Sequence, residues 1–209
     1  MLIKTLPVGM LDTNCYVITD EKTLKCAIID PGADSNTILD YIESNHLVPE
    51  VIFLTHGHFD HHIALGTVME STGAMAYINK KDATTDGWHE QLKLADDGHM
   101  NWYGEGDIIK IGGLIFQIME TPGHSPGSVT ILCENALFTG DTLFRDSCGR
   151  TDLDGSSPDA LMDSLRRLAS LHGDYEVYPG HADSSTLNRE RAFNYYMRQA
   201  LGQQHNEQK

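Results

Sequence analysis

The feature that most constrains the fold is a set of four short apolar runs, each of which ends at a polar residue able to bind a metal. The runs are "AIID", "VIFLTH", "ALFTGD" and "YEVYPGH", and they end at Asp30, His56, Asp141 and His181. Their length and composition predict buried β-strands. Ligand sites in α/β proteins lie at the carboxyl ends of strands, so we expect these four residues to meet at one rim.

Two stretches between the strands have helical periodicity. Residues 35–45, "SNTILDYIESN", place apolar side chains on one face, and residues 157–173, "SPDALMDSLRRLASLHG", do the same. The second stretch also has helix boundary signals. Ser157 is suited to cap the first turn, Pro158 fits the first helical position, and Gly173 predicts the end of the helix.

Two β-hairpins are predicted between residues 107 and 139. The segments "DIIKIGGLIFQI" and "SVTILCENALFT" place turn residues, Gly112-Gly113 and Glu134-Asn135, between apolar strands. Strands mixed with helical patterns in this way indicate an α/β protein in which helices cover the sheets.

Composition limits the class of protein further. With 209 residues and 40% hydrophobic content, the chain is expected to form one globular domain over 1–209, with a frayed tail at 202–209. A formal net charge of −15 argues against nucleic acid as a partner. No secretory signal or apolar membrane span is recognisable, so a cytoplasmic protein is expected.

The four cysteines do not form a metal-binding motif. They are scattered without a CxxC pair, which argues against a zinc ribbon, and a disulfide framework would be unusual at this length. Cys26 and Cys133 are flanked by apolar residues and are interpreted as core thiols.

The stretch "THGHFDHH" concentrates metal-binding side chains after one of the predicted strands. In an extended loop, residues two apart point the same way, so His56 and His58 can hold one ion while Asp60 and His61 turn towards a second. The alternative is a histidine-rich loop that binds metal adventitiously, or imidazoles that make hydrogen bonds in the core. A lone histidine would favour that alternative.

Three further motifs place one candidate ligand each at a glycine-bearing turn. They are "TPGHSPGS" at His124, "FTGDTLF" at Asp141 and "YPGHAD" at His181. The ordered set resembles the metallo-β-lactamase superfamily, specifically its glyoxalase II-like hydrolases, over essentially the whole chain. The resemblance implies an αβ/βα sandwich, with two mixed β-sheets face to face and helices outside.

The resemblance also implies three ligands for each of two metals and one bridging carboxylate. The ligands are His56, His58 and His124 for the first metal, Asp60, His61 and His181 for the second, and Asp141 for the bridge. His62 lies outside the pattern and is interpreted as the start of the following helix. Asp30 either orients a ligand or forms the turn before Pro31, and both interpretations stay open.

The implied chemistry is hydrolysis by a metal-bound hydroxide. Two dications that share a water lower its pKa, and they stabilise the oxyanion formed at an attacked acyl carbon. We expect Zn²⁺, two ions per chain, with iron or mixed metals as alternatives. Asp60 would first be a ligand and could also steer protons. The expected substrate is a small acyl-thioester such as S-lactoylglutathione; the sequence leaves the oligomeric state open.

The resemblance is weaker at the substrate side. Only a short tail follows His181, whereas glyoxalase II proper has a longer helical domain that helps to bind glutathione. In "NRERAFNYYMRQAL", Arg189 and Arg191 either meet a carboxylated substrate or form a solvated helical face, with Phe193, Met197 and Leu201 packing inward. The sequence also leaves open the roles of two loop positions, Arg150 and Ala182.

At the first of these positions, "CGRTD", Arg150 is a candidate substrate contact or pairs with Asp152 to hold the loop. The second is Ala182, which stands where glycine is frequent in the family. Three other functions remain as alternatives to thioester hydrolysis. They are a persulfide dioxygenase with mononuclear iron, a lactonase and a non-catalytic metal-binding module; the absence of a recognisable export signal and the presence of Asp141 argue against an exported β-lactamase.

Overall fold

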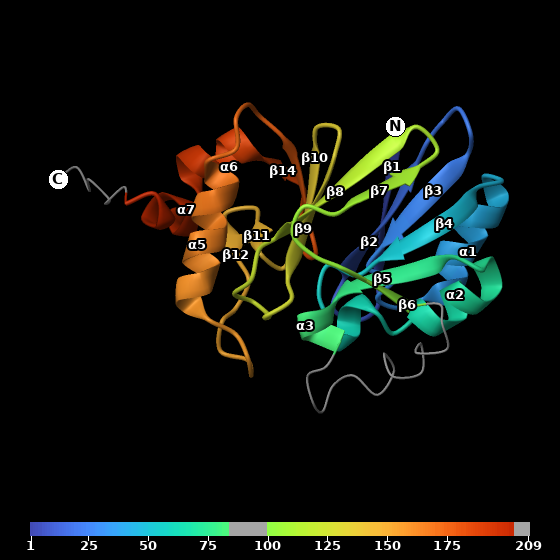
Figure 1. Cartoon of the computed structure of the whole chain (residues 1–209), viewed down its shortest axis with the longest axis horizontal. Helices are drawn as coiled ribbons and strands as arrows, with labels where there is room; N and C mark the ends of the chain where they lie inside the picture. The colour runs from blue at the N-terminus through green and yellow to red at the C-terminus, as the bar shows by residue number, and fades with distance from the viewer. Residues whose placement is uncertain (84–99, 203–209) are drawn as a thin grey trace.

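Two six-stranded sheets face each other in the computed structural model, which describes residues 1–83 and 100–202 (Figure 1). The strands of the first sheet are, in spatial order, β1 (Leu2–Val8), β2 (Thr13–Thr19), β3 (Lys25–Ile29), β4 (Val48–Phe53), β5 (Met75–Asn79) and β6 (Met100–Tyr103). Those of the second are β14 (Ser185–Thr186), β13 (Glu176–Pro179), β10 (Ala136–Gly140), β9 (Val129–Cys133), β8 (Leu114–Glu120) and β7 (Ile108–Ile111). Both sheets are mixed, since β3 to β6 run parallel in the first and β10 pairs parallel with β13 in the second.

Helices cover the outer faces of the sandwich. Beside the first sheet lie α1 (Ser35–Ser44) and α2 (Leu65–Thr72), and beside the second lie α5 (Pro158–Ala169), α6 (Leu187–Phe193) and α7 (Tyr195–Ala200) (Figure 1). Short elements at the sheet ends are η1 (Phe59–His61), α3 (Lys80–Ala83), and the small hairpin of β11 (Leu143–Phe144) and β12 (Ser147–Cys148). The expected αβ/βα sandwich is confirmed.

The core has three layers because each sheet buries both faces. Side chains such as Phe53, Phe116 and Phe138 fill the space between the sheets. Neighbours along a strand point to opposite faces, so Ile29 joins this central layer while Ile28 packs towards α1 and α2. A third layer lies under α5 to α7. Cys26 and Cys133 are fully buried in this core, as the sequence predicts.

The predicted strands and hairpins that position the site are confirmed. β3, β4, β10 and β13 coincide with the four apolar runs, and each ends one to three residues before Asp30, His56, Asp141 or His181. The hairpins β7–β8 and β9–β10 turn at the expected dipeptides. Because the four strand ends lie at one end of the sandwich, loops from both sheets meet there.

Two details of the helical predictions are wrong. α5 begins as expected, with the Ser157 hydroxyl accepting from the Ala160 amide, but it ends at Ala169 rather than near Gly173. The C-terminal stretch forms two helices, since Asn194 ends α6 and caps α7. This break resets the helical phase. Met197 is buried, but Phe193 is 70% exposed and Leu201 is 38% exposed instead of packing inward.

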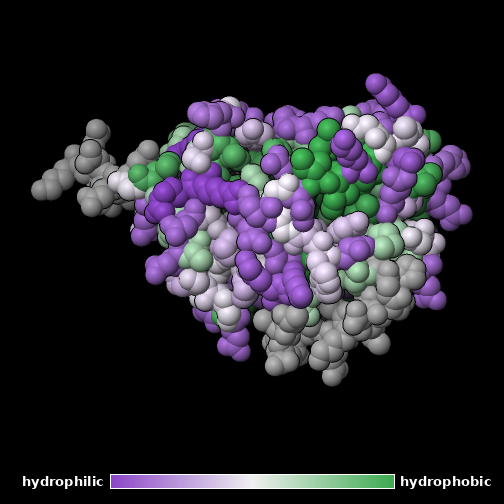
Figure 2. All heavy atoms as spheres, in the orientation of Figure 1, coloured by the Kyte–Doolittle hydropathy of each residue, from purple (hydrophilic) through white to green (hydrophobic). Residues whose placement is uncertain are grey.

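The surface in the view of Figure 2 is largely hydrophilic, and the largest group of hydrophobic side chains lies over the β7–β8 hairpin. Ile108 and Ile115 are exposed there. Helices in the two described ranges all lack the length and apolar character that a membrane crossing requires. The expected frayed tail lies outside the described residues except for Gly202.

Candidate metal centre

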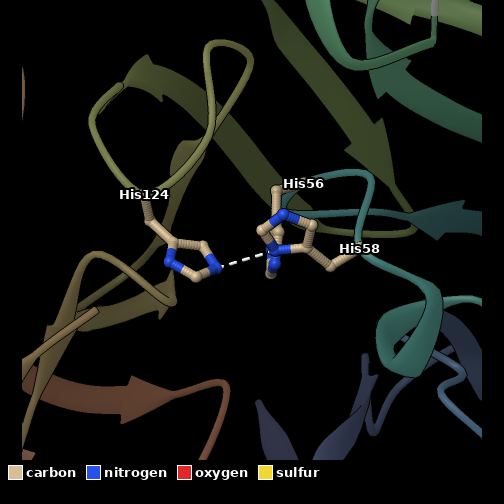
Figure 3. Close-up of side chains that lie close together, drawn as sticks. All are labelled: His56, His58 and His124. Atoms are coloured by element: carbon tan, nitrogen blue, oxygen red, sulfur yellow. Dashed lines mark hydrogen bonds between the residues drawn. The ribbon is translucent and has the colours of Figure 1, made fainter. Parts of the chain in front are cut away.

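Three imidazoles from two loops converge at one end of the sandwich (Figure 3). His56 and His58 come from the loop after β4, and His124 comes from the loop between β8 and β9. Their nitrogen donors lie within 4.8 Å of one another, and His58 Nδ1 is 2.8 Å from His124 Nε2. This is the group that the sequence assigns to the first metal.

A second group lies beside the first. Asp60, His61 and His181 offer donor atoms that also lie within 4.8 Å of one another. One carboxylate oxygen of Asp60 is 3.2 Å from His181 Nε2 and 3.6 Å from His61 Nε2. All three residues stand in the set that the sequence assigns to the second metal.

The carboxylate of Asp141 lies between the two groups. Its oxygens are 3.4 Å from His124 Nε2, 3.5 Å from His61 Nε2 and 3.6 Å from His181 Nε2. It therefore faces one histidine of the first group and two of the second. This is the position that a bridging ligand must occupy.

The donors fit a pair of divalent ions. Zinc ligand atoms at bond lengths of about 2.0–2.1 Å lie roughly 3.3 Å apart, and the carboxylate oxygens of Asp60 and Asp141 lie 3.2–3.6 Å from the imidazole nitrogens that they face. Within the described residues, His56 Nε2, His61 Nε2 and one oxygen of Asp141 are buried and have no hydrogen-bond partner. A buried polar atom without a partner is costly, and coordination of an ion would remove that cost.

Space beside the centre is kept by Gly180. A Cβ atom at this position would lie 2.3 Å from an oxygen of Asp141 and 2.8 Å from the His61 ring. The glycine of "PGH" therefore lets the β13 end approach the two candidate ligands.

Outer partners fix which nitrogen of each imidazole faces the centre. Four histidines have a hydrogen-bond partner at Nδ1. For His56 it is Thr55 Oγ1 at 3.1 Å, and for His61 it is Asp30 at 2.9 Å. For His124 it is the Arg150 carbonyl at 2.9 Å, and for His181 it is the Leu11 carbonyl at 3.1 Å. Their Nε2 atoms are left for an ion, whereas His58 presents Nδ1 to the group.

Both interpretations of Asp30 are confirmed. It takes the left-handed conformation, with φ of 50°, at the turn before Pro31. Its carboxylate, 1% exposed, also accepts hydrogen bonds from the amide and hydroxyl of Thr55 and from His61. Asp30 thus orients histidines from "THGHFDHH" while it turns the chain.

The carboxylates around His61 create a strong preference for a cation. Burial alone would lower the pKa of His61, but the charges of Asp141 and Asp30 raise it to about 9. Burial would raise the pKa of Asp60, yet its hydrogen bond with His181 holds that pKa below the usual range. Burial and neighbouring imidazoles lower the pKa of His56. The first group is thus suited to bind through neutral imidazoles, and the second sits among negative charges.

His62 does not begin the following helix, because α2 starts only at Leu65. Its ring is buried, and its Nε2 lies 3.2 Å from the Gly57 carbonyl oxygen. It does not belong to any group of clustered metal donors found in the described residues. His62 therefore supports the loop that carries His56 and His58.

The arginines near the site have structural partners. Arg150 pairs with Asp152 through two hydrogen bonds of 2.6 and 2.7 Å, although its side chain is 63% exposed. Arg189 binds Asp146 and Glu190, and Arg191 binds the carbonyls of residues 169, 171 and 173. The pairing interpretation of Arg150 is confirmed, and the two tail arginines hold helices and the β11–β12 hairpin.

Ala182 adopts φ of 66°, the left-handed region that glycine tolerates best. The backbone conformation explains why glycine is frequent at this position. Sequence reasoning missed Thr55, whose only signal is its place directly before His56, and Thr13, whose hydroxyl lies 3.3 Å from Asp60. It also missed Asp82, which is buried and accepts hydrogen bonds from both loops of the first group.

Comparison with known proteins gives a consistent result. The model of the metallo-beta-lactamase superfamily matches residues 8–181. The hydroxyacylglutathione hydrolase GloC of Haemophilus influenzae is 32% identical over 209 residues, which covers 94% of this chain and 98% of that protein.

Solved structures agree in fold at similar identity. The B3 metallo-beta-lactamase BLEG-1 has a TM-score of 0.84 at 30% identity and covers 94% of this chain and 99% of its own. ETHE1 from Myxococcus xanthus has a TM-score of 0.80 at 30% identity, covering 93% and 84%. TTHA1623, solved in a di-iron-bound form, has a TM-score of 0.80 at 33% identity, covering 92% and 99%.

Proposed function

The chain belongs to the metallo-β-lactamase superfamily, whose members are generally metal-dependent hydrolases, and we propose that it hydrolyses a small acyl-thioester of the S-lactoylglutathione type. The proposal includes two metal ions per chain, zinc or a mixture of zinc and iron. The first ion would be held by His56, His58 and His124 and the second by Asp60, His61 and His181, and Asp141 would be the shared ligand.

One observation carries the proposal. Seven donor side chains from separate loops meet in overlapping groups, and the buried donors of His56, His61 and Asp141 have no hydrogen-bond partner among the described residues. An accidental cluster of histidines would satisfy its buried nitrogens within the protein. The donor set, imidazole with carboxylate, suits zinc and iron.

Residues of the chain would orient the metal ligands and steer protons, and the ions would activate the water. Ions bound there would supply an activated water and stabilise the negative charge that develops on the acyl oxygen. Thr55, Asp30 and the carbonyls of Leu11 and Arg150 hold the imidazoles in one tautomer. Asp60 contacts His181 at the partly exposed side of the centre, and as a ligand of the second ion it would also help to steer protons there.

The substrate assignment rests on a relative and on leaving-group chemistry. GloC bears the name hydroxyacylglutathione hydrolase and aligns over nearly its full length. A thiolate leaves without obligatory protonation, so a site without a dedicated general acid suffices for a thioester. The exposed guanidinium of Arg150 is the candidate contact for a carboxylate of the thiol carrier.

A direct experiment combines elemental analysis of the purified protein with assays on S-lactoylglutathione and glutathione persulfide. We expect close to two ions per chain and release of free thiol from the thioester. One iron per chain, together with oxygen uptake on the persulfide and no thioester cleavage, would overturn the proposal in favour of a dioxygenase. Cleavage of a lactone but not of the thioester would establish the lactonase alternative.

A further inference from the structure

Asp82 is a buried carboxylate at the end of the sandwich that holds the metal centre. It lies in α3, directly after β5, and is 2% exposed. The seven candidate ligands do not include it, and the sequence motifs give no reason to expect a buried acid there. A buried carboxylate is costly unless it accepts several hydrogen bonds, so the groups that donate to Asp82 indicate what it does.

The hydrogen-bond donors to Asp82 come from two loops that belong to different sheets. One oxygen, Oδ2, accepts from the Gly57 amide at 2.8 Å and from the Ser125 hydroxyl at 2.6 Å. The other, Oδ1, accepts from the Gly127 amide at 2.5 Å. A single oxygen atom therefore joins the loop after β4 to the loop between β8 and β9.

Both loops carry candidate ligands of the first metal at the joined positions. Gly57 stands between His56 and His58, and Ser125 directly follows His124. A shift at either contact would move the imidazole next to it. His58 Nδ1 and His124 Nε2, which these two loops carry, lie 2.8 Å apart.

We propose that Asp82 is a positioning residue for the first metal, which ties together the two loops that supply His56, His58 and His124. The inference rests on the ligand assignment of the proposed function. Asp82 does not touch the ion. It sets the spacing of the three imidazoles before an ion binds, so ion binding does not carry the free-energy cost of ordering them.

The α3 turn is itself anchored to both sheets, which gives Asp82 a fixed point. Asn79, at the end of β5, accepts from the Lys81 amide at 3.0 Å and donates to Glu120, at the end of β8, at 2.9 Å. Lys81 forms an ion pair with Glu120 at 2.8 Å. Asp82 thus sits between anchored neighbours rather than on a free loop.

Gly127 must be glycine for the carboxylate to come this close. A Cβ atom at this position would lie 2.6–2.8 Å from three atoms of Asp82. A methyl group there must push Asp82 away from both loops. The glycine of "HSPGS" is therefore part of the same arrangement.

The main test is Asp82→Asn, measured as zinc binding against a chelator and as the absorption spectrum of the cobalt-substituted protein. The asparagine side chain has the same shape as aspartate, but one of its two oxygens is replaced by an NH₂ group. That group would face the N–H or O–H donors that bond to the carboxylate in the wild type. We expect the affinity of the first ion to fall about 10–100-fold, as for other outer partners of metal ligands, with the second ion little changed. The matched control is Asp30→Asn, because the carboxylate of Asp30 holds His61, a candidate ligand of the second ion. This substitution should lower the affinity for the second ion more than the affinity for the first.

Gly127→Ala provides a second route if Asp82→Asn does not fold. It should weaken the first ion, whereas Gly66→Ala, whose Cβ would meet no described atom within 4 Å, should not. Equal zinc affinity in wild type, Asp82→Asn and Gly127→Ala, or an equal loss at both ions, would overturn the inference. Failure of the wild type itself to bind two ions would instead count against the proposed function.

Discussion

The carboxylate of Asp30 accepts the Nδ1 hydrogen of His61 across 2.9 Å, and both side chains are buried. A carboxylate can only accept, so Nδ1 carries a proton in this contact, and Nε2 is the nitrogen that remains for an ion. The residue that turns the chain after β3 thereby fixes a histidine that lies in η1. Strand ends and metal chemistry are coupled directly in this fold.

The bridge is tested by Asp141→Asn. Because Asp141 faces histidines of both groups, the amide should lower the occupancy of both ions and remove most thioester hydrolysis. Elemental analysis of the dialysed protein measures occupancy, and Asp154→Asn, at an exposed aspartate, is the control. Full occupancy of two ions in Asp141→Asn would show that the bridge is assigned to the wrong residue.

Much of the fold could be predicted because strands and ligands are encoded locally. An apolar run that stops at a histidine or aspartate indicates both a buried strand and its site end, as for β4 and His56. The spacing in "THGHFDHH" likewise predicts two neighbouring groups of donors. Neither inference requires knowledge of distant contacts.

The parts that could not be predicted depend on tertiary contacts. Asp82 looks like an ordinary surface acid in "NKKDA" until the fold brings Gly57, Ser125 and Gly127 to it. The break at Asn194 depends on distant partners too, since its side chain donates to the carbonyls of Phe144 and Ser147. Helical periodicity contains neither kind of information.

A loss of stability rather than of substrate affinity is expected for Arg189→Ala. The guanidinium holds Asp146 of the β11–β12 hairpin and contacts Glu190, which is fully buried. The melting temperature should fall while KM for S-lactoylglutathione stays the same. Lys110→Ala, at an exposed cation on β7, should change neither quantity. A rise in KM at an unchanged melting temperature would restore Arg189 as a substrate contact.

Arg150→Ala addresses the candidate substrate contact. If the exposed guanidinium binds a carboxylate of the thiol carrier, its loss should raise KM with little change in kcat or metal content, because remote binding is shared by ground and transition states. Asp152→Ala removes its present partner and should leave KM equal or lower. Equal rises of KM in both variants would show that the pair only holds the loop.

The pH dependence of stability has one contribution that is independent of the metal centre. Asp20 accepts from Thr23, Gly113 and Lys22, and these hydrogen bonds lower its pKa from the ordinary 3.8. A depressed folded-state pKa stabilises the fold above the unfolded value and loses this effect as the pH falls. Asp20→Asn should therefore be less stable than wild type at pH 7, and the difference in urea unfolding should shrink below about pH 4. A difference that persists unchanged at the lowest pH would exclude this origin.

His181→Ala tests whether thioester hydrolysis needs two ions. His181 lies at the partly exposed side of the centre, 3.2 Å from Asp60, and its Nδ1 is held by the Leu11 carbonyl. Its removal should release the second ion and lower kcat by roughly 100-fold or more, beyond the 10–100-fold effect of losing an outer partner. The loss should be the same for every thioester, because the activated water is common to all of them. Unchanged turnover in a protein that has lost one ion would mean that a single metal suffices, and the reaction would then have to be assigned to the first group alone.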